Sequence, residues 1–519
     1  MLAQIALALF TLALARLAWR LLLRLTQGSP LDNIPGPAPA SMLTGNFGQL
    51  FNEDAWDFHE KLAAEYGPVI RTTGLLGEKQ LYIADAKALH NIVVKDQDIY
   101  EEHPQFISAN RIVFGQGLIS TLGDKHKKQR KLMNPVFSIA HMRNMIPIFQ
   151  EVVGTTLHEL TAEGPREIDM LHWMSRAALE LIGRSGLGYS FDTLAVNDPG
   201  NPYAASIKEL VPAVFRMVFF RVYVLPRVYQ LGPAWLRRAA VNLIPSRNLH
   251  SVRDKVDLMW RTSHEIYAQK RAALAAGDKA VAQQVGKGKD ILSLLMRANM
   301  QAESPLPEDE VLAQMSTLIF AGMDTTSTAL SRILYLLAEH PEVQDRLREE
   351  IRAAKEAHGV LTYDNLEAMT YLDAVCRETL RLYPPVSQLL RKTVKDVAMP
   401  FGKPVIGVDG RAMNDVFVPS GTPVVISIIN ANRNKELWGP DALEWRPERW
   451  LAPLPEAVTE AHMPGVYSNL MTFLGGGRAC IGFKFSQLEM KVVLVELVDA
   501  FKFAPSKKVL KWRMANIAS

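Results

Sequence analysis

One cysteine near the C-terminal end stands in a pattern that suits binding of a metal-bearing cofactor. The ten residues from Phe473 to Gly482 read FLGGGRACIG, and an apolar helical pattern follows from Phe485 to Phe501. Glycines let a loop pass flat against a large planar ligand, and the free N–H groups at the start of a helix favour a thiolate. An isolated cysteine is more often a buried, inert apolar residue. That alternative does not explain the glycines and the arginine around Cys480, so the pattern favours a thiolate ligand.

These ten residues resemble the signature of the cytochrome P-450 family, Phe-x-x-Gly-x-Arg-x-Cys-x-Gly, at every defined position. The resemblance implies that Cys480 is the axial ligand of heme b (iron protoporphyrin IX) and that Phe473 packs beside its sulfur. It also implies that Gly476 and Gly482 admit the backbone to the heme, and that Arg478 binds a heme propionate. Thiolate ligation gives electron density to the iron and favours cleavage of the O–O bond.

A helical pattern from Glu308 to Glu339 contains a second candidate site, the sequence AGMDTT at residues 321–326. Its first two residues lie four and three positions before Thr325, so the three share one face of a helix. A glycine, together with a hydroxyl that bonds back to the carbonyl four residues earlier, can open a helix locally. The segment resembles the family's oxygen-activation segment, in which Asp324 and Thr325 would deliver protons. The alternative is a kinked core helix with an exposed Asp324.

A charged pair, Glu378 and Arg381, lies three residues apart on a predicted helix, and Arg449 follows in the sequence RPERW. Such a pair by itself is usually a solvated surface salt bridge of little energetic value. Together the three residues resemble the family's Glu-x-x-Arg helix and the arginine that completes its buried charge network. The resemblance implies a structural role for them and no catalytic one.

Two further positions resemble the family's propionate-binding residues. Arg130 stands where the family has the arginine of Trp-x-x-x-Arg, and His126 replaces the tryptophan. His126 and Arg130 lie four residues apart, so both can donate to one carboxylate. Arg391, ten residues after Arg381, falls where the family has another propionate arginine, although a surface charge beside Lys392 is the alternative interpretation.

Elements able to position these residues are mostly helices. The apolar periodicity predicts helices over 129–160, 168–187, 251–276, 308–339, 341–358 and 372–382. Short strands are predicted within 67–83 and 416–429, the second with a turn at Pro419–Thr422. We therefore expect a mainly α fold with small β-sheets, and the resemblance implies a single large cytochrome P-450-like domain around a buried heme.

The N-terminal residues 1–25 are predicted to anchor the chain in a membrane. Leu2–Ala15 carry no charge, and the apolar character continues to Leu25, interrupted by three arginines spaced four apart. A helix of this length reaches about 36 Å, enough to cross a bilayer. The positive charges follow the apolar run, which places the rest of the chain in the cytosol. A cleaved secretory signal and a helix lying flat in the interface are the alternatives.

A Pro/Gly-rich segment, residues 26–45, should form a stiff, non-helical linker. The monooxygenase domain is then predicted to occupy residues 46–519. The net charge of +4 is small for this length, and no long basic run indicates nucleic-acid binding. Cys376 and Cys480 are the two cysteines of the chain, and neither has the spacing of a zinc site.

The resemblance implies an NADPH- and O2-dependent monooxygenase that hydroxylates or epoxidises a lipophilic small molecule. Fungal microsomal members commonly act in this way in secondary metabolism, such as terpenoid or aromatic biosynthesis. Electrons would come from a separate NADPH-cytochrome P-450 reductase, because the chain lacks a Gly-rich dinucleotide fingerprint. We expect a monomer in the endoplasmic reticulum membrane, with the catalytic domain facing the cytosol.

Regions that line the substrate pocket in relatives carry apolar residues here, which favours a lipophilic substrate. They are Phe106, Ile107, Ile112, Phe114 and Leu118, then residues 211–224 and residues 386–390. A heme-thiolate isomerase or dehydratase is an alternative function, although the pair Asp324 and Thr325 argues against it. Because 39 residues follow Cys480, fewer than in most relatives, a truncated heme-binding form with little activity is a further alternative.

Overall fold

The computed structural model describes residues 28–161, 164–198 and 200–514, together with residues 4, 11, 12, 15, 16 and 19. The chain divides into two compact units. The first comprises the described residues up to Glu101 with Ser387–Ala442 and Pro455–Arg478. The second comprises Glu102–Val386, Leu443–Leu454 and the described residues from Ala479 onward. Each unit therefore combines segments that are far apart in the sequence.

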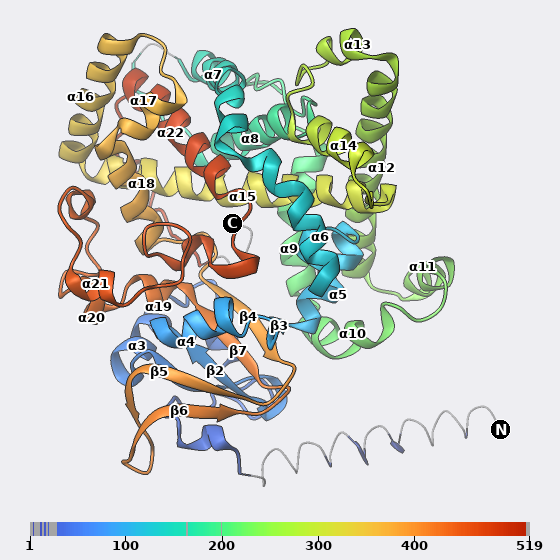
Figure 1. The fold of residues 1–519 in the computed structure, drawn as a ribbon, viewed down its shortest axis with the longest axis vertical. Helices are drawn as coiled ribbons and strands as arrows, with labels where there is room; N and C mark the ends of the chain where they lie inside the picture. The colour runs from blue at the N-terminus through green and yellow to red at the C-terminus, as the bar shows by residue number, and fades with distance from the viewer. Residues whose placement is uncertain are drawn as a thin grey trace. The chain divides into compact units, whose positions relative to one another are not determined.

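A five-stranded sheet organises the first unit (Figure 1). Its order is β1 (Val69–Thr73), β2 (Lys79–Ile83), β7 (Pro423–Ser427), β4 (Gln388–Thr393) and β3 (Tyr100–Glu102). Strands β2 and β7 pair in parallel, whereas β1 with β2 and β4 with β7 are antiparallel. Every residue of β7 is buried, as the apolar sequence of a strand with neighbours on both sides requires.

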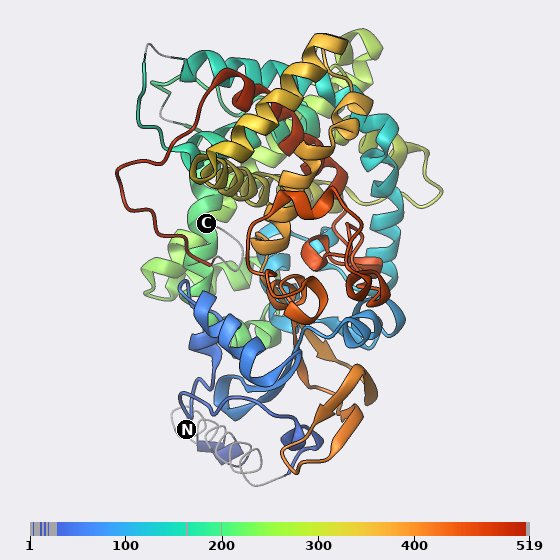
Figure 2. The same cartoon turned by 90° about the vertical axis from the view of Figure 1, so that its left-hand side faces the viewer.

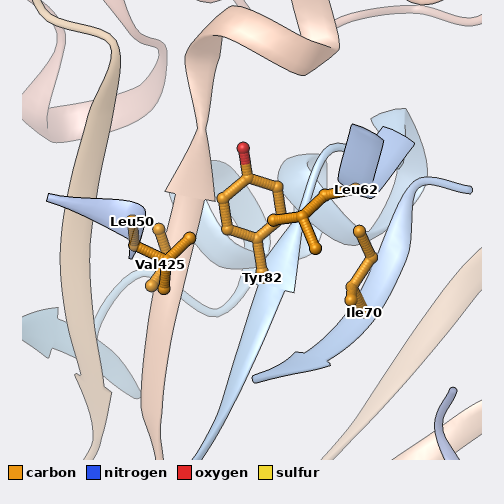
Figure 3. Close-up of a cluster of buried hydrophobic side chains, with 5 residues drawn as sticks. All are labelled: Leu50, Leu62, Ile70, Tyr82 and Val425. Carbon is orange, nitrogen blue, oxygen red and sulfur yellow. The ribbon is translucent and has the colours of Figure 1, made fainter. Parts of the chain in front are cut away.

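Apolar side chains from the five-stranded sheet and from two short N-terminal helices form a core cluster of this unit. Figure 3 shows Tyr82 and Ile70 from the sheet beside Leu50, Leu62 and Val425. Leu50 ends α2 (Phe47–Leu50), and Leu62 lies in α3 (Trp56–Tyr66). The Tyr82 hydroxyl accepts a hydrogen bond from the Ser427 hydroxyl at 2.6 Å, so the one polar atom of the cluster is satisfied.

A second sheet and several short helices complete the first unit. The sheet pairs β5 (Val397–Ile406) with β6 (Ala412–Val418) in antiparallel fashion. The short helical segments are η1 (Pro30–Asn33), η2 (Leu75–Gly77), α4 (Ala86–His90), η3 (Asn91–Lys95), α19 (Ile428–Asn432), α20 (Lys435–Trp438), α21 (Glu456–Glu460), η9 (Met471–Phe473) and η10 (Gly476–Arg478).

Helix α15 (Glu308–Glu339) runs through the second unit, and other helices pack around it (Figure 1). Its contacts are with α8 (Met170–Leu181), α12 (Arg247–Ala276), α18 (Thr370–Leu382) and α22 (Phe483–Ala500). Most side chains of α15 are buried, and they lie on every face of the helix, which is typical of a helix in the core of a large unit.

The remaining helices of the second unit surround this core. Figure 2 shows α16 (Pro341–His358) beside α22, and these helices are in contact. The others are α5 (Pro104–Phe114), η4 (Leu118–Ser120), α6 (Gly123–Met133), η5 (Asn134–Phe137), α7 (Ile139–Leu160), η6 (Ile182–Leu187), α9 (Pro202–Phe215), η7 (Phe220–Val224), α10 (Leu225–Val228), α11 (Ala234–Leu243), α13 (Asp278–Ala282), α14 (Ile291–Gln301), α17 (Tyr363–Ala368) and η8 (Pro447–Trp450).

The predicted fold class, mainly α with small sheets, is confirmed. The predicted helices 308–339 and 341–358 have the observed bounds. The single helix predicted over 129–160 is wrong, because α6 ends at Met133 and α7 begins at Ile139. Pro135 lies in the 3-10 turn between them and cannot donate to a continuous helical ladder.

The N-terminal predictions meet the structure only in part, because most of residues 1–27 lie outside the described residues. Within the described chain, no helix combines the length and apolar character that crossing a bilayer requires. The predicted linker is ordered: Leu31 and Ile34 are buried, and the Pro35 carbonyl accepts a hydrogen bond from the Arg71 N–H at 2.9 Å. The residues of this segment from Ser29 onward therefore pack within the first unit, and the predicted start of the monooxygenase domain at Asn46 stays a prediction.

Candidate active site

Cys480 lies in the loop that leads into α22, two residues before the helix cap Gly482. The Cys480 side chain is accessible at the surface of the described chain. Nearby protein atoms nevertheless displace water from around the sulfur, and this desolvation raises the pKa of the thiol. The Gly482 N–H donates to the sulfur, and the Arg130 guanidinium is close enough to act on it; both lower the pKa. These two groups favour a thiolate at the position where the sequence predicts a metal ligand.

Arg130 and His126 lie on α6, and Arg130 contacts the cysteine loop. The Arg130 Nη1 donates to the carbonyl of Ala479, the residue before Cys480, and its Nε donates to the Asn134 Oδ1 at 3.0 Å. His126 is buried one turn earlier on the same helix. The structure thus brings Arg130 to the cysteine loop, and the predicted propionate binding by both residues stays a prediction.

Within the first unit, Phe473 and the glycines after it are held by close packing. The Phe473 ring meets the Tyr467 ring edge to face, with 5.5 Å between centroids. A Cβ at Gly476, where φ is +67°, would lie 1.7 Å from the Val93 carbonyl oxygen. The Gly477 N–H donates to the Gln97 Oε1 at 2.9 Å. Glycine at position 476 is therefore required by the neighbouring backbone of Val93, a reason that the sequence pattern alone did not indicate.

Arg391 and Arg478 also belong to the first unit. Arg391 is 3% exposed in β4, so the alternative interpretation of a surface charge is wrong. Its Nη1 donates to the Leu390 carbonyl at 3.2 Å. Arg478 ends the short turn η10 and is half-buried. Their predicted roles at heme propionates stay predictions.

The candidate oxygen-activation residues lie in the middle of α15. Asp324 is 4% exposed, so the alternative of a solvent-exposed carboxylate is wrong. The Thr325 hydroxyl donates to the Ala321 carbonyl at 2.8 Å, as its position four residues later predicts. A Cβ at Gly322 would lie 3.2 Å from the Ile182 side chain, so this glycine permits close packing of η6. Helix α15 continues without interruption through these residues, in contrast to the predicted local opening.

Three polar residues near this segment, Ser486, Glu489 and Lys208, were not identified from the sequence. The Thr326 and Ser486 hydroxyls lie 3.2 Å apart and link α15 to α22. Glu489, one turn beyond Ser486, is fully buried, and both its carboxyl oxygens lack a hydrogen-bond partner among the described residues. Burial lowers the pKa of Lys208 on α9, against the opposing influence of the Asp324 charge. Only the tertiary fold brings Lys208 within reach of Asp324, so no sequence spacing could reveal it.

The predicted charge network around Glu378 is buried as expected. Glu378 accepts two hydrogen bonds from Arg381, at 2.8 and 2.9 Å, and both side chains are fully buried. The Arg449 Nε lies 3.4 Å from the same carboxylate, and the Trp450 Nε1 donates to it at 2.9 Å. The interpretation as a solvated surface pair is therefore wrong.

Cys480 is a single accessible thiol, and a single protein ligand fits a cofactor that supplies the other ligands of its metal. Among the described residues, no cluster of three or more His, Cys, Asp or Glu side chains could hold a bare metal ion. A Cβ at Gly482 would meet only Phe137, at an ordinary 3.9 Å, so protein packing does not itself require glycine there. One accessible thiol beside a position without a side chain suits axial ligation of a planar metal complex such as heme.

Comparison with known proteins agrees with this assignment. The profile of the family described as cytochrome P450 matches residues 35–516. Cytochrome P450 monooxygenase 91 of Postia placenta is 52% identical over 96% of this chain and 92% of its own length. Ganoderic acid synthetase of Ganoderma lucidum is 42% identical over 97% and 93%, and a cytochrome P450 monooxygenase of Hericium erinaceus is 41% identical over 96% and 92%. The chain therefore belongs to the cytochrome P450 family.

Proposed function

We propose that this cytochrome P450 monooxygenase inserts one oxygen atom from O2 into a lipophilic small molecule, by hydroxylation or epoxidation. The observation that carries the proposal is the accessible Cys480 thiol, whose sulfur accepts from the Gly482 N–H and lies near the Arg130 guanidinium. When bound, heme b supplies the reductive activation and cleavage of dioxygen that no side chain can perform.

The residues of α15 would handle the protons of this reaction. The Thr325 hydroxyl is half-buried and anchored to the Ala321 carbonyl, so it is held in one orientation and can pass a proton on. The neighbouring Asp324 is buried, and its charge acts on Lys208 of α9. We infer that Asp324 takes protons from the α9 side and that Thr325 presents them to the reacting oxygen.

Electrons would come from NADPH through a separate NADPH-cytochrome P-450 reductase. One basic residue follows Cys480 in the sequence, and others lie on the exposed side of α6. Helix α6 is close to the cysteine loop, because its Arg130 donates to the Ala479 carbonyl. Lys127 and Lys128 are exposed, and Lys484 is half-buried. Such a basic surface would attract an acidic partner and raise its rate of association.

The substrate is proposed to come from fungal secondary metabolism, such as terpenoid or aromatic biosynthesis. The ganoderic acid synthetase of Ganoderma lucidum, which is 42% identical, supports this class by its name.

Membrane association is proposed on the basis of an exposed apolar surface. Along η7 to α11, large apolar side chains face solvent, including Trp235, which is 71% exposed, and Leu243, which is 82% exposed. Exposed arginines lie among them, as in helices that rest on anionic bilayers. This surface supports contact with a membrane, and we propose that the enzyme is a monomer at the endoplasmic reticulum membrane, facing the cytosol.

The proposed function is tested by reconstituting the chain with heme, the reductase and a panel of lipophilic terpenoids and aromatics. NADPH oxidation and product mass are measured together, with the Cys480→Ser variant as control. A product heavier by one oxygen, labelled from 18O2, is expected. An isomer or dehydration product formed without NADPH would instead assign the chain to the isomerase or dehydratase class, and heme binding without any turnover would contradict the proposal.

A further inference from the structure

The C-terminal tail that follows α22 returns to the core helix α15. Residues 501–514 contain no helix or strand, and the tail is the red segment that loops outward in Figure 2. Near its start, Gln344 of α16 pairs with both backbone groups of Phe503, at 2.8 and 3.0 Å. Residues 504–511 are exposed, and Val509 is 97% exposed. The tail is therefore anchored at its start and then lies on the surface until a second anchor beyond residue 511.

The second anchor is Trp512, which stacks on Arg332 of α15. The guanidinium carbon of Arg332 lies 3.7 Å from the centroid of the Trp512 ring and 4.1 Å from that of the Tyr383 ring. The Tyr335 ring of α15 also meets the Trp512 ring, with 5.4 Å between centroids. Arg332 is 8% exposed and Trp512 is half-buried. The stack is thus largely removed from water, and cation–π contacts are strongest when they are desolvated.

Arg332 lies on the same face of α15 as Thr325. The periodicity of an α-helix places Ala321, Thr325, Thr328 and Arg332 in one stripe along its surface. Arg332 is two turns, or about 10 Å along the helix axis, beyond Thr325. Ala321 is exposed and Thr325 is half-buried, whereas Trp512 covers the stripe at Arg332. The tail therefore contacts this stripe where its open part ends.

The middle of α15 contains several features that weaken a helix. The hydroxyls of Thr325 and Ser331 donate to the carbonyls four residues earlier, at 2.8 and 2.7 Å, and Ser327 donates to the Asp324 carbonyl at 3.0 Å. Such bonds slightly destabilise helices and often bend them, and Gly322 adds a residue of low helix propensity. Because the Thr325 hydroxyl is anchored to a carbonyl of this same stretch, a change in helix curvature would redirect it. Contacts from outside the helix must therefore restrain it.

We propose that Trp512 is a positioning residue for the reaction, because its stack on Arg332 restrains the stripe of α15 that carries Thr325. The inference rests on the proposed monooxygenase function and adds a residue outside its proton path. Tyr383 is the C-cap of α18, the helix that contains the buried charge network, so it supplies a fixed side of the stack. Trp512 supplies the nearer ring and couples the tail to the helix.

The first test measures coupling in the full-length, heme-loaded chain with reductase and a substrate that the chain oxidises. Trp512→Ala should raise the ratio of peroxide to oxygenated product about 3- to 30-fold, the range expected for loss of a desolvated cation–π contact. Trp512→Leu keeps apolar volume without a ring and should do the same. Trp512→Phe should stay within about twofold of the unmodified chain, because it keeps a ring. Both products come from the same heme-loaded molecules, so a smaller folded fraction does not change their ratio.

The second test is hydrogen exchange of the α15 backbone amides in the heme-loaded chain, which does not depend on turnover. Amides of residues 322–332 should exchange about 3- to 30-fold faster in Trp512→Ala and in Trp512→Leu, because local opening becomes easier. Arg143→Met is the matched control. It removes a guanidinium that lies 5.6 Å from the Tyr363 ring centroid, in a contact between α7 and α17. Both readouts should be unchanged in this control.

Several outcomes would overturn the inference. They are unchanged exchange of residues 322–332 in Trp512→Ala, a loss of coupling in Trp512→Phe as large as in Trp512→Ala, and equal effects of Arg143→Met. Faster exchange with an unchanged product ratio would also overturn it, because the stack would then stabilise α15 without positioning Thr325. If Trp512→Ala binds no heme, the comparison of Trp512→Phe with Trp512→Leu decides.

Failure of the proposed function is recognised separately. Faster exchange in Trp512→Ala, with no oxygenated product from any chain, would contradict the monooxygenase proposal and uphold the restraint on α15. Conversely, a native chain that forms oxygenated product, with the same coupling in Trp512→Ala, would contradict the role of Trp512 alone.

Discussion

Replacing Glu378 by Gln tests whether the buried charge network is structural. The Glu378 carboxylate accepts from five donors: both Arg381 nitrogens at 2.8 and 2.9 Å, the Arg446 N–H at 3.1 Å, the Arg449 Nε at 3.4 Å and the Trp450 Nε1 at 2.9 Å. The substitution keeps the shape but leaves the fully buried Arg381 without its negative partner. Removing one partner of a buried pair costs about 3–5 kcal/mol of unfolding free energy.

The assay is urea unfolding of the holoprotein, followed by tryptophan fluorescence and by heme release. With an m value of at least about 3 kcal/mol per M urea for a chain of this length, the midpoint should fall by up to about 1 to 1.7 M. Lys502→Gln removes an exposed pair with Asp345, whose atoms lie 3.5 Å apart, and should change the free energy by less than about 1 kcal/mol. An unchanged midpoint for Glu378→Gln, together with lost activity, would refute the structural role.

Three further outcomes are expected. Thr325→Ala should keep heme and ligand binding but raise peroxide released per NADPH consumed, because the hydroxyl held on Ala321 is lost; unchanged coupling would remove Thr325 from the proton path. Burial raises the pKa of Glu489 well above its unfolded value, so the stability of the native chain should fall as pH rises above about 5. Glu489→Gln should match the native chain below that pH and exceed it increasingly above, and parallel pH profiles in urea unfolding would contradict this. Replacing Trp235 and Leu236 by Ser should weaken flotation with phospholipid vesicles while leaving the heme spectrum intact, whereas undiminished flotation would exclude this surface.

The site was readable from the sequence where chemistry follows local spacing. The glycine-rich loop and Cys480 stand at fixed offsets before a helix, and Thr325 reaches the Ala321 carbonyl because both lie on one helix face. Bounds of α15 and α16 were also readable, since Pro341 starts the second helix directly after the first ends. The break between α6 and α7 was missed because apolar periodicity continues across Pro135.

Residues whose role depends on distant segments were not readable in this way. The environments of Glu489 and Lys208 arise from helices that meet only in the folded chain, and their own sequence neighbourhoods look like ordinary helix. Burial of Arg391 likewise follows from pairing of β4 with β7. Tertiary contacts, which composition and periodicity do not encode, decided each of these.

The most direct test of a heme held by the Cys480 thiolate is the spectrum of the reduced carbon monoxide complex in the native chain and in Cys480→Ser. The native chain should show the red-shifted band of thiolate-ligated heme. Cys480→Ser should lose that band, because a hydroxyl is a far poorer anionic ligand than a thiol at neutral pH. Cys376→Ser is the control and should keep the band, since Cys376 is buried in α18 and burial raises the pKa of its thiol to about 12. Survival of the red-shifted band in Cys480→Ser would contradict the account.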